Sequence, residues 1–201
     1  PNANASSLTK KRTKALALLV PDITNPFFTT VGRGIEDKAI AHGLNVIMCS
    51  SDEDVRRERD YVRTLIERRI DGVVVAPAGA DARHLRLLAR QGAKIVLLDR
   101  ELEDIEADAV IGDSFQGAYE LTSHLISLGH RRIAMITGPP WVSTSKQRLQ
   151  GYKKALQDAG LEFNENLVVR GNYKQDGGRA GAARILEVSR ESRSEDRPTA
   201  I

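Results

Sequence analysis

Several polar and aromatic side chains follow apolar runs of the sequence, where predicted strands end. An aromatic face can stack against the C–H face of a sugar or against a flat base. A carboxylate can accept two hydroxyl protons, and a guanidinium offers a rigid fork of donors. The chain has only nine aromatic residues, and four of them belong to this set, so the set is not a sample of ordinary core residues. Its members are Asn25, Phe27, Phe28, Asp99, Arg100, Trp141, Arg148 and Tyr173.

A plainer interpretation exists for each of these residues taken alone. Phe27 and Phe28 could cap the hydrophobic core, and Asp99 with Arg100 could form a surface pair. Carboxyl ends of parallel strands meet at one edge of a sheet, however, and ligand pockets gather there. The clustering of the set at successive strand ends therefore favours a binding site.

The segment 15–34 shows how these side chains are positioned. Leu16 to Val20 is an apolar run bounded by Pro21, which is typical of a strand buried on both faces. From Thr29 the apolar residues recur every four positions, which predicts a helix. The order strand, loop, helix places Asn25 and the Phe pair at the carboxyl end of the strand.

The rest of the chain repeats this unit. Further strands are predicted at 45–49, 72–77, 94–98, 109–111, 132–136 and 167–169, and helices at 52–70, 81–91, 114–126, 147–159 and 178–188. Such alternation predicts an α/β protein with doubly wound parallel sheets. Five strands precede a crossover at Gly112–Ser114, with Ser114 as the helix cap, and about three follow it. We therefore expect two lobes, 15–113 and 114–201, with a ligand cleft between them, after a linker at 1–14. The stretch 198–201 has the character of a strand being entered, so we expect the chain to be cut there.

Catalytic and cofactor motifs are absent from the sequence. Gly32-Arg33-Gly34 lacks the third glycine of a dinucleotide loop, and Gly138-Pro139-Pro140 lacks the lysine and hydroxyl of a phosphate loop. The four histidines have no metal-ligand spacing, and no Gly-x-Ser-x-Gly sequence occurs. We expect no enzyme activity, no cofactor and no metal, and we interpret the acidic runs around Asp52 and Glu101 as solvated faces.

Composition narrows the class of protein. The chain is 41% hydrophobic and 28% charged, with a net charge of +3, as in ordinary globular proteins. No apolar run approaches the ~20 residues of a membrane-spanning helix, and the first residues lack the apolar core of a secretory signal. The single cysteine, Cys49, lies in an apolar run and should be a buried thiol. One cysteine excludes an internal disulfide and fits a reducing compartment, so we expect a cytoplasmic location without membrane contact.

The amino-terminal segment carries a separate signal. Lys10, Lys11, Arg12 and Lys14 form a basic tract that could bind phosphates or could be a solvated linker. The preceding residues 4–8 could form a helix with Leu8 projecting. A helix this short would fold only against a partner.

Taken together, these stretches resemble the LacI/GalR family of bacterial transcriptional repressors. The resemblance rests on PNANASSL, LLVPDITNPFF, DGVVVAP, LLDRE, GHRRIAMITGP and RLQGYKKAL, in order along the whole chain. It implies a helix-turn-helix before Pro1, a hinge helix in PNANASSL, operator DNA as partner and a homodimer. Leu8 would wedge between base steps in the minor groove. The implied DNA-binding residues are Asn4, Ser7, Leu8, Lys10 and Arg12.

The resemblance also implies an effector domain like the periplasmic sugar-binding proteins. By the pattern of ribose-binding members, Asp99, Arg100 and Arg148 would bind sugar hydroxyls. Asn25, Phe27, Phe28 and Tyr173 complete the implied pocket, the three aromatics lying around the ring. Val142 stands where purine-responsive relatives have a basic residue, which favours a pentose such as ribose over a purine. The alternatives are a sugar-transport protein of the same fold, which would have no use for PNANASSL, and an enzyme on this fold.

Overall fold

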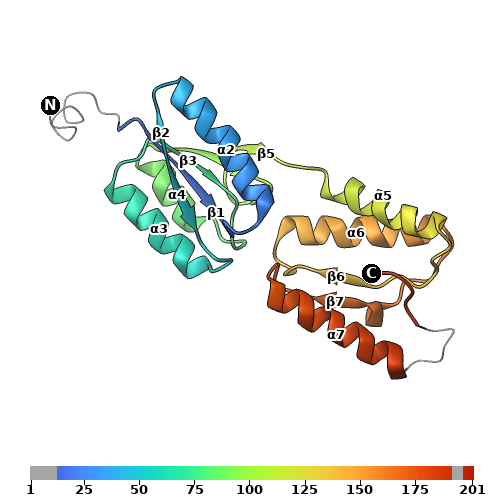
Figure 1. The fold of residues 1–201 in the computed structure, drawn as a ribbon. Coiled ribbons are helices and arrows are strands. Elements are labelled where there is room, and N and C mark those ends of the chain that lie inside the picture. The colour runs from blue at the N-terminus through green and yellow to red at the C-terminus, as the bar shows by residue number, and fades with distance from the viewer. Residues whose placement is uncertain (1–12, 192–196) are drawn as a thin grey trace. The chain divides into compact units, whose positions relative to one another are not determined.

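The computed structural model describes residues 13–191 and 197–201, and the chain divides into two compact units after Ile111 (Figure 1). The predicted hinge residues Asn4, Ser7, Leu8, Lys10 and Arg12 lie outside the described residues.

The first unit is built on one five-stranded parallel sheet. Its strand order is β2-β1-β3-β4-β5, so β3 lies at the centre. The strands are β1 (Ala15–Val20), β2 (Asn45–Ser50), β3 (Gly72–Val75), β4 (Lys94–Leu98) and β5 (Asp108–Val110).

Helices cover both faces of this sheet (Figure 1). They are α2 (Pro26–Ala41), α3 (Val55–Glu67) and α4 (Arg83–Arg90). In β1, Ala17 and Leu19 pack in the cluster formed with α3 and α4, whereas Leu18 and Val20 pack with residues of α2. Alternate residues of a strand face opposite sides, so the apolar run of β1 is explained by burial on both faces, as predicted.

The second unit repeats the plan around a smaller sheet. β6 (Met135–Thr137) and β7 (Val168–Arg170) are parallel, and Ile133 forms an isolated parallel bridge with Ala200. One face packs against α5 (Ser114–Ser127) and α6 (Ser143–Asp158), and the other against α7 (Gln175–Glu191). A short 3₁₀ helix, η1 (Glu165–Leu167), precedes β7. The predicted α/β class with parallel sheets is confirmed, and the two sheets are separate.

Element boundaries in the second unit differ from the predictions. The strand expected at 132–136 lies later, at Met135–Thr137, and α6 begins at Ser143 instead of residue 147. Ser and Thr have low intrinsic helix propensity, so the first turn of α6 is not evident from the sequence. Asp113, not Ser114, caps α5, because its Oδ1 accepts the N–H of Gln116 at 2.8 Å. Among the described residues no helix is long and apolar enough to cross a membrane.

Candidate ligand-binding site

The loop after β1 presents one of the two predicted aromatic rings. Asn25 caps α2, its side-chain oxygen accepting the N–H of Phe27 at 3.0 Å, and Pro26 follows in the first turn. The ring of Phe28 is buried (4% exposed) in the core beneath α2, whereas Phe27 is 47% exposed. The two rings meet edge to face at 5.0 Å between centroids. Phe27 therefore presents a half-exposed ring, and Phe28 supports it from the core.

Asp99 and Arg100 follow β4 at the same edge of the sheet. Arg100 is buried, and it donates from Nη1 to Oε2 of Glu53 at 2.8 Å and from Nη2 to Oε1 at 2.7 Å. This two-point pair orients the guanidinium. The Glu53 side chain is only 11% exposed, so the interpretation of the acidic run around Asp52 as a solvated face is wrong at this position.

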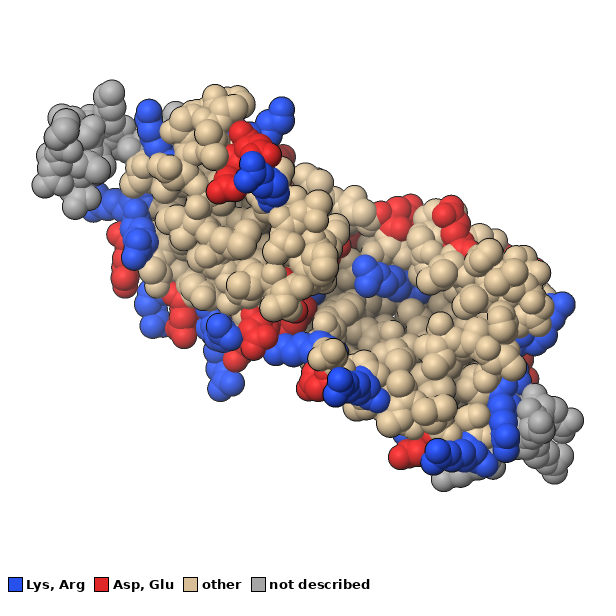
Figure 2. Space-filling model, in the orientation of Figure 1, with Lys and Arg blue, Asp and Glu red and all other residues tan. Residues whose placement is uncertain are grey.

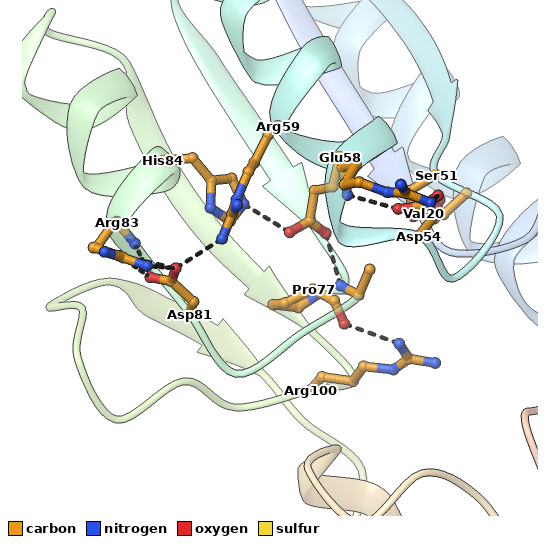
Figure 3. Close-up of polar contacts among 12 residues, drawn as sticks. Val20, Ser51, Asp54, Glu58, Arg59, Pro77, Asp81, Arg83, His84 and Arg100 are labelled. Atoms are coloured by element: carbon orange, nitrogen blue, oxygen red, sulfur yellow. Dashed lines mark hydrogen bonds and ion pairs between the residues drawn. The ribbon is translucent and has the colours of Figure 1, made fainter.

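A buried carboxylate supports the next loop, which follows β3 (Figure 3). Oε2 of Glu58 accepts the N–H of Ala78 at 2.7 Å, and its Oε1 lies 2.7 Å from Nε2 of His84. Arg100 donates to the carbonyl of Pro77 at 2.9 Å. Sequence reasoning missed Glu58 and His84. The signal was the spacing of Glu58 with Val62 and Leu65, which places it on the buried face of α3.

The second unit holds Tyr173 against the first turn of α6. The Tyr173 hydroxyl lies 2.5 Å from Oγ of Ser145 and 3.3 Å from Oγ1 of Thr144, both buried residues. A Cβ at Gly138 would collide with the Tyr173 ring, so glycine is needed where β6 ends. Arg148 is exposed three positions after Ser145 on α6.

Left-handed backbone occurs after three of these strands, as it also does at Lys14 and Arg69 elsewhere in the first unit. Asp52, Glu53, Asp99 and Tyr173 all have φ between 56° and 64°, a region that non-glycine residues seldom adopt. Such strain persists where surrounding contacts hold it, and it is concentrated at functional sites. Each unit thus places charged and aromatic side chains, partly on strained backbone, at the carboxyl edge of its own sheet.

The surface of the first unit carries acidic and basic side chains of both signs. On the face drawn in Figure 2, acidic and basic side chains of the first unit lie beside one another. Arg59 and Arg83, for example, both pair with Asp81, and the hydrogen bonds from Arg83 hold the pKa of that carboxyl well below its usual range.

Across residues 13–191 and 197–201, no group of three or more His, Cys, Asp or Glu side chains could hold a metal ion. Cys49 is buried, as predicted, and burial raises the pKa of its thiol.

Comparison with known proteins identifies the family. Residues 13–189 match the family of periplasmic binding proteins and the sugar-binding domain of the LacI family, and the chain belongs to it. The HTH-type transcriptional repressor PurR of Photobacterium profundum is 34% identical over 202 residues, which cover 100% of this chain and 59% of that protein. The chain therefore spans less than two thirds of this relative's length. The resemblance inferred from the sequence is confirmed.

Solved structures of transcription regulators have a similar fold. A crystal structure described as a ribose operon repressor from Burkholderia thailandensis is 34% identical, with a TM-score of 0.81, covering 94% of this chain and 67% of that one. The Cra dual regulator of Pseudomonas putida, solved with fructose 1-phosphate, is 25% identical, also with a TM-score of 0.81, and covers 93% of this chain and 65% of that one.

Proposed function

We propose that this chain is the effector-binding and dimerisation part of a sugar-responsive, DNA-binding transcriptional repressor. The observation that carries the proposal is the gathering of hydroxyl-binding and aromatic side chains at the carboxyl edges of both sheets, in a chain of this family. The relatives are transcriptional regulators, and none of the side chains described above forms a nucleophile–base pair of a catalytic site.

The proposed effector is a pentose such as ribose. Phe27 offers an exposed ring face, Asp99 a carboxylate, and Arg148 an exposed guanidinium. Arg100, which Glu53 and Pro77 hold in a buried position after β4, would meet a sugar hydroxyl from there, and Tyr173 would line the ring. Phe28 and Asn25 would contribute by holding the start of α2. The likeness to a protein described as a ribose operon repressor, and to a regulator solved with a sugar phosphate, supports this class of ligand.

Operator DNA is the proposed partner of the homodimer, in the cytoplasm. Leu8 would enter the minor groove, with Asn4 and Ser7 beside it, and Lys10 and Arg12 would meet phosphates. The sugar would shift an equilibrium between two arrangements of the protein that differ in DNA affinity. The transport-protein alternative predicts sugar binding without DNA binding, so a gel-shift titration of the full-length protein separates the two.

Calorimetry of the full-length protein tests the sugar site. D-ribose, other pentoses, hexoses and purines form the panel, and D-ribose should bind most tightly. Asp99→Ala and Arg148→Ala should each lower affinity by roughly one to two decades, the effect of losing a hydrogen bond to a charged group. Arg63→Ala, which removes an arginine with a 75% exposed side chain from α3, is the control and should bind as wild type does.

Two results would count against the sugar site. Wild-type protein that binds no sugar of the panel would exclude the effector class, and unchanged affinity in both variants would show that the pocket is misassigned. The DNA interface is tested separately with Leu8→Ala, which should weaken operator binding and leave sugar affinity unchanged.

A further inference from the structure

The peptide bond between Pro77 and Ala78 is held on both sides by buried charged groups (Figure 3). Its C=O accepts from Nη1 of Arg100 at 2.9 Å, and its N–H donates to Oε2 of Glu58 at 2.7 Å. The residue Glu58 is 1% exposed and Arg100 is 4% exposed. A single peptide plane therefore lies between an anion and a cation in a region from which water is largely excluded.

This arrangement selects one orientation of the peptide. A carboxylate only accepts hydrogen bonds and a guanidinium only donates them. Turning the peptide over would point its C=O at the carboxylate of Glu58 and its N–H at the guanidinium of Arg100. Both contacts would be repulsive, and low local polarity would strengthen the repulsion.

Each charged group is itself held in place. The second oxygen of Glu58, Oε1, lies 2.7 Å from Nε2 of His84, whose side chain is 8% exposed. Arg100 is held by both oxygens of Glu53. The next residue of the loop, Gly79, lies so close to α3 that a Cβ would come within 2.6 Å of the Val55 side chain. The carboxylate and the guanidinium thus have little freedom to follow a turning peptide.

The place of this peptide in the fold connects it to the binding site. It follows β3, the central strand of the sheet, at the edge where Asp99 and Arg100 follow β4. We propose that Glu58 is a positioning residue for the sugar: by fixing the Pro77–Ala78 peptide it fixes the loop 76–80 and the side chain of Arg100. The inference rests on the proposed function and adds to it a residue that touches no ligand.

Amide hydrogen exchange at Ala78 tests the first step without any ligand. In the full-length protein, Glu58→Ala should speed exchange of this amide by about tenfold or more, because its acceptor is gone. Glu58→Gln keeps an acceptor oxygen at the same reach and should stay within about threefold of wild type. Glu67→Gln, the same exchange at an exposed position of α3, is the matched control. Equal exchange in Glu58→Ala and wild type would overturn the proposal.

D-ribose affinity of the same variants tests the second step. Glu58→Ala should bind D-ribose about tenfold more weakly and Glu58→Gln should restore affinity to within about threefold, whereas Glu67→Gln should match wild type. A purely structural role would lower the unfolding midpoint and leave the affinity of the folded protein unchanged, and that result would overturn the proposal. If Glu58→Ala does not fold, Glu58→Asp replaces it, since it keeps the charge but withdraws the carboxylate from Ala78.

Failure of the proposed function would look different. Wild-type protein that binds no D-ribose would remove the proposed effector, and the exchange rates alone would then decide whether Glu58 fixes the peptide. Ribose binding that is equal in wild type and Glu58→Ala would leave the sugar function standing and exclude the positioning role.

Discussion

Arg100 and Glu53 are 47 positions apart and join the ends of β4 and β2 through two hydrogen bonds of 2.7 and 2.8 Å. In the sheet, β1 and β3 lie between these two strands. The pair therefore ties the carboxyl edge of the first sheet together across its centre. Because the guanidinium is oriented by Glu53, the group proposed to meet the sugar is already in place before a ligand arrives.

Replacing Glu53 with alanine should destabilise the first unit strongly. The Arg100 side chain is only 5% exposed, and removing one partner of a buried pair typically costs about 3–5 kcal/mol, because the other charge remains buried. Urea unfolding should show this loss for Glu53→Ala, a smaller one for Glu53→Gln, and none of this size for Glu67→Ala at an exposed position. An unfolding curve for Glu53→Ala that overlays wild type would mean that solvent or other groups compensate Arg100 fully.

The sequence predicted the positions of helices and strands with a clear apolar pattern better than it predicted the contacts of single side chains. The apolar run of β1 and the helical spacing of α2 follow from local patterns, and both elements form as expected. The pairing of Glu53 with Arg100 depends on a left-handed backbone at Glu53, where φ is 57°, and no residue pattern announces that conformation for glutamate. Partners so far apart in the chain become neighbours only through the order of the strands.

The Phe pair shows the same limit within the candidate site. Composition and position singled out Phe27 and Phe28 together, but adjacent residues at a helix start face different ways. Phe28 enters the core and Phe27 faces solvent. For Asn25, the sequence suggested a ligand contact, while the structure shows the side-chain oxygen starting α2. The capping role was not predicted from the sequence, and the ligand contact of Asn25 stays a prediction.

Two helical glycines should respond in opposite directions to alanine. Gly117 on α5 has open space around its missing Cβ, so Gly117→Ala should raise the free energy of unfolding by about 0.5–1 kcal/mol through helix propensity. Gly151 on α6 packs against the backbone of Phe115 and Tyr119 on α5, so Gly151→Ala should lower it by about 1–3 kcal/mol through overpacking. Urea unfolding of both variants is the measurement. Stabilisation by Gly151→Ala would show that α5 and α6 separate easily.

Alkaline pH should weaken the second unit through Tyr152. Burial raises the pKa of its phenol to about 12 from an ordinary value of 10, and the hydroxyl donates to the carbonyl of Ile133 at 2.8 Å. The folded state favours the neutral phenol, so this contribution is complete below pH 10. It is lost as pH rises through about 12, by at most about 1.4 kcal/mol per pH unit.

The variant Tyr152→Phe isolates that contribution. It should lower stability at pH 7 by about 1–3 kcal/mol, since the buried Ile133 carbonyl loses its donor, and it should flatten the decline above pH 10. Tyr61→Phe, the same atom removed from the first unit, should leave the decline in place. Thermal unfolding of wild type, Tyr152→Phe and Tyr61→Phe between pH 7 and 12 measures these differences. Parallel curves for wild type and Tyr152→Phe would assign the decline to other groups.

Asp71 binds the backbone of Thr13 and Lys14 at the edge of the sheet opposite the proposed sugar site. Its two carboxylate oxygens accept the backbone N–H groups of Thr13 at 3.3 Å and Lys14 at 2.7 Å, and the Thr13 hydroxyl donates to the carbonyl of Arg69 at 3.0 Å. Lys14 has a φ of 55°, a strained conformation that these bonds hold. The carboxylate of Asp71, together with the carbonyl of Arg69 and the N–H of Asn45, therefore holds the backbone at Thr13 and Lys14.

We expect Asp71→Ala to separate DNA binding from sugar binding. In the full-length protein, loss of the two bonds should free the junction and weaken operator binding by about tenfold, while D-ribose affinity at the opposite edge stays within about twofold of wild type. Asp71→Asn keeps one acceptor oxygen, so its operator affinity should lie between those of wild type and Asp71→Ala. Asp60→Asn, at an exposed position of α3, should bind operator and D-ribose as wild type does. Gel-shift titration and calorimetry on the same preparations provide both affinities. Equal losses in DNA and sugar affinity would indicate general destabilisation, and unchanged DNA affinity would show that the segment binds its operator without guidance from this junction.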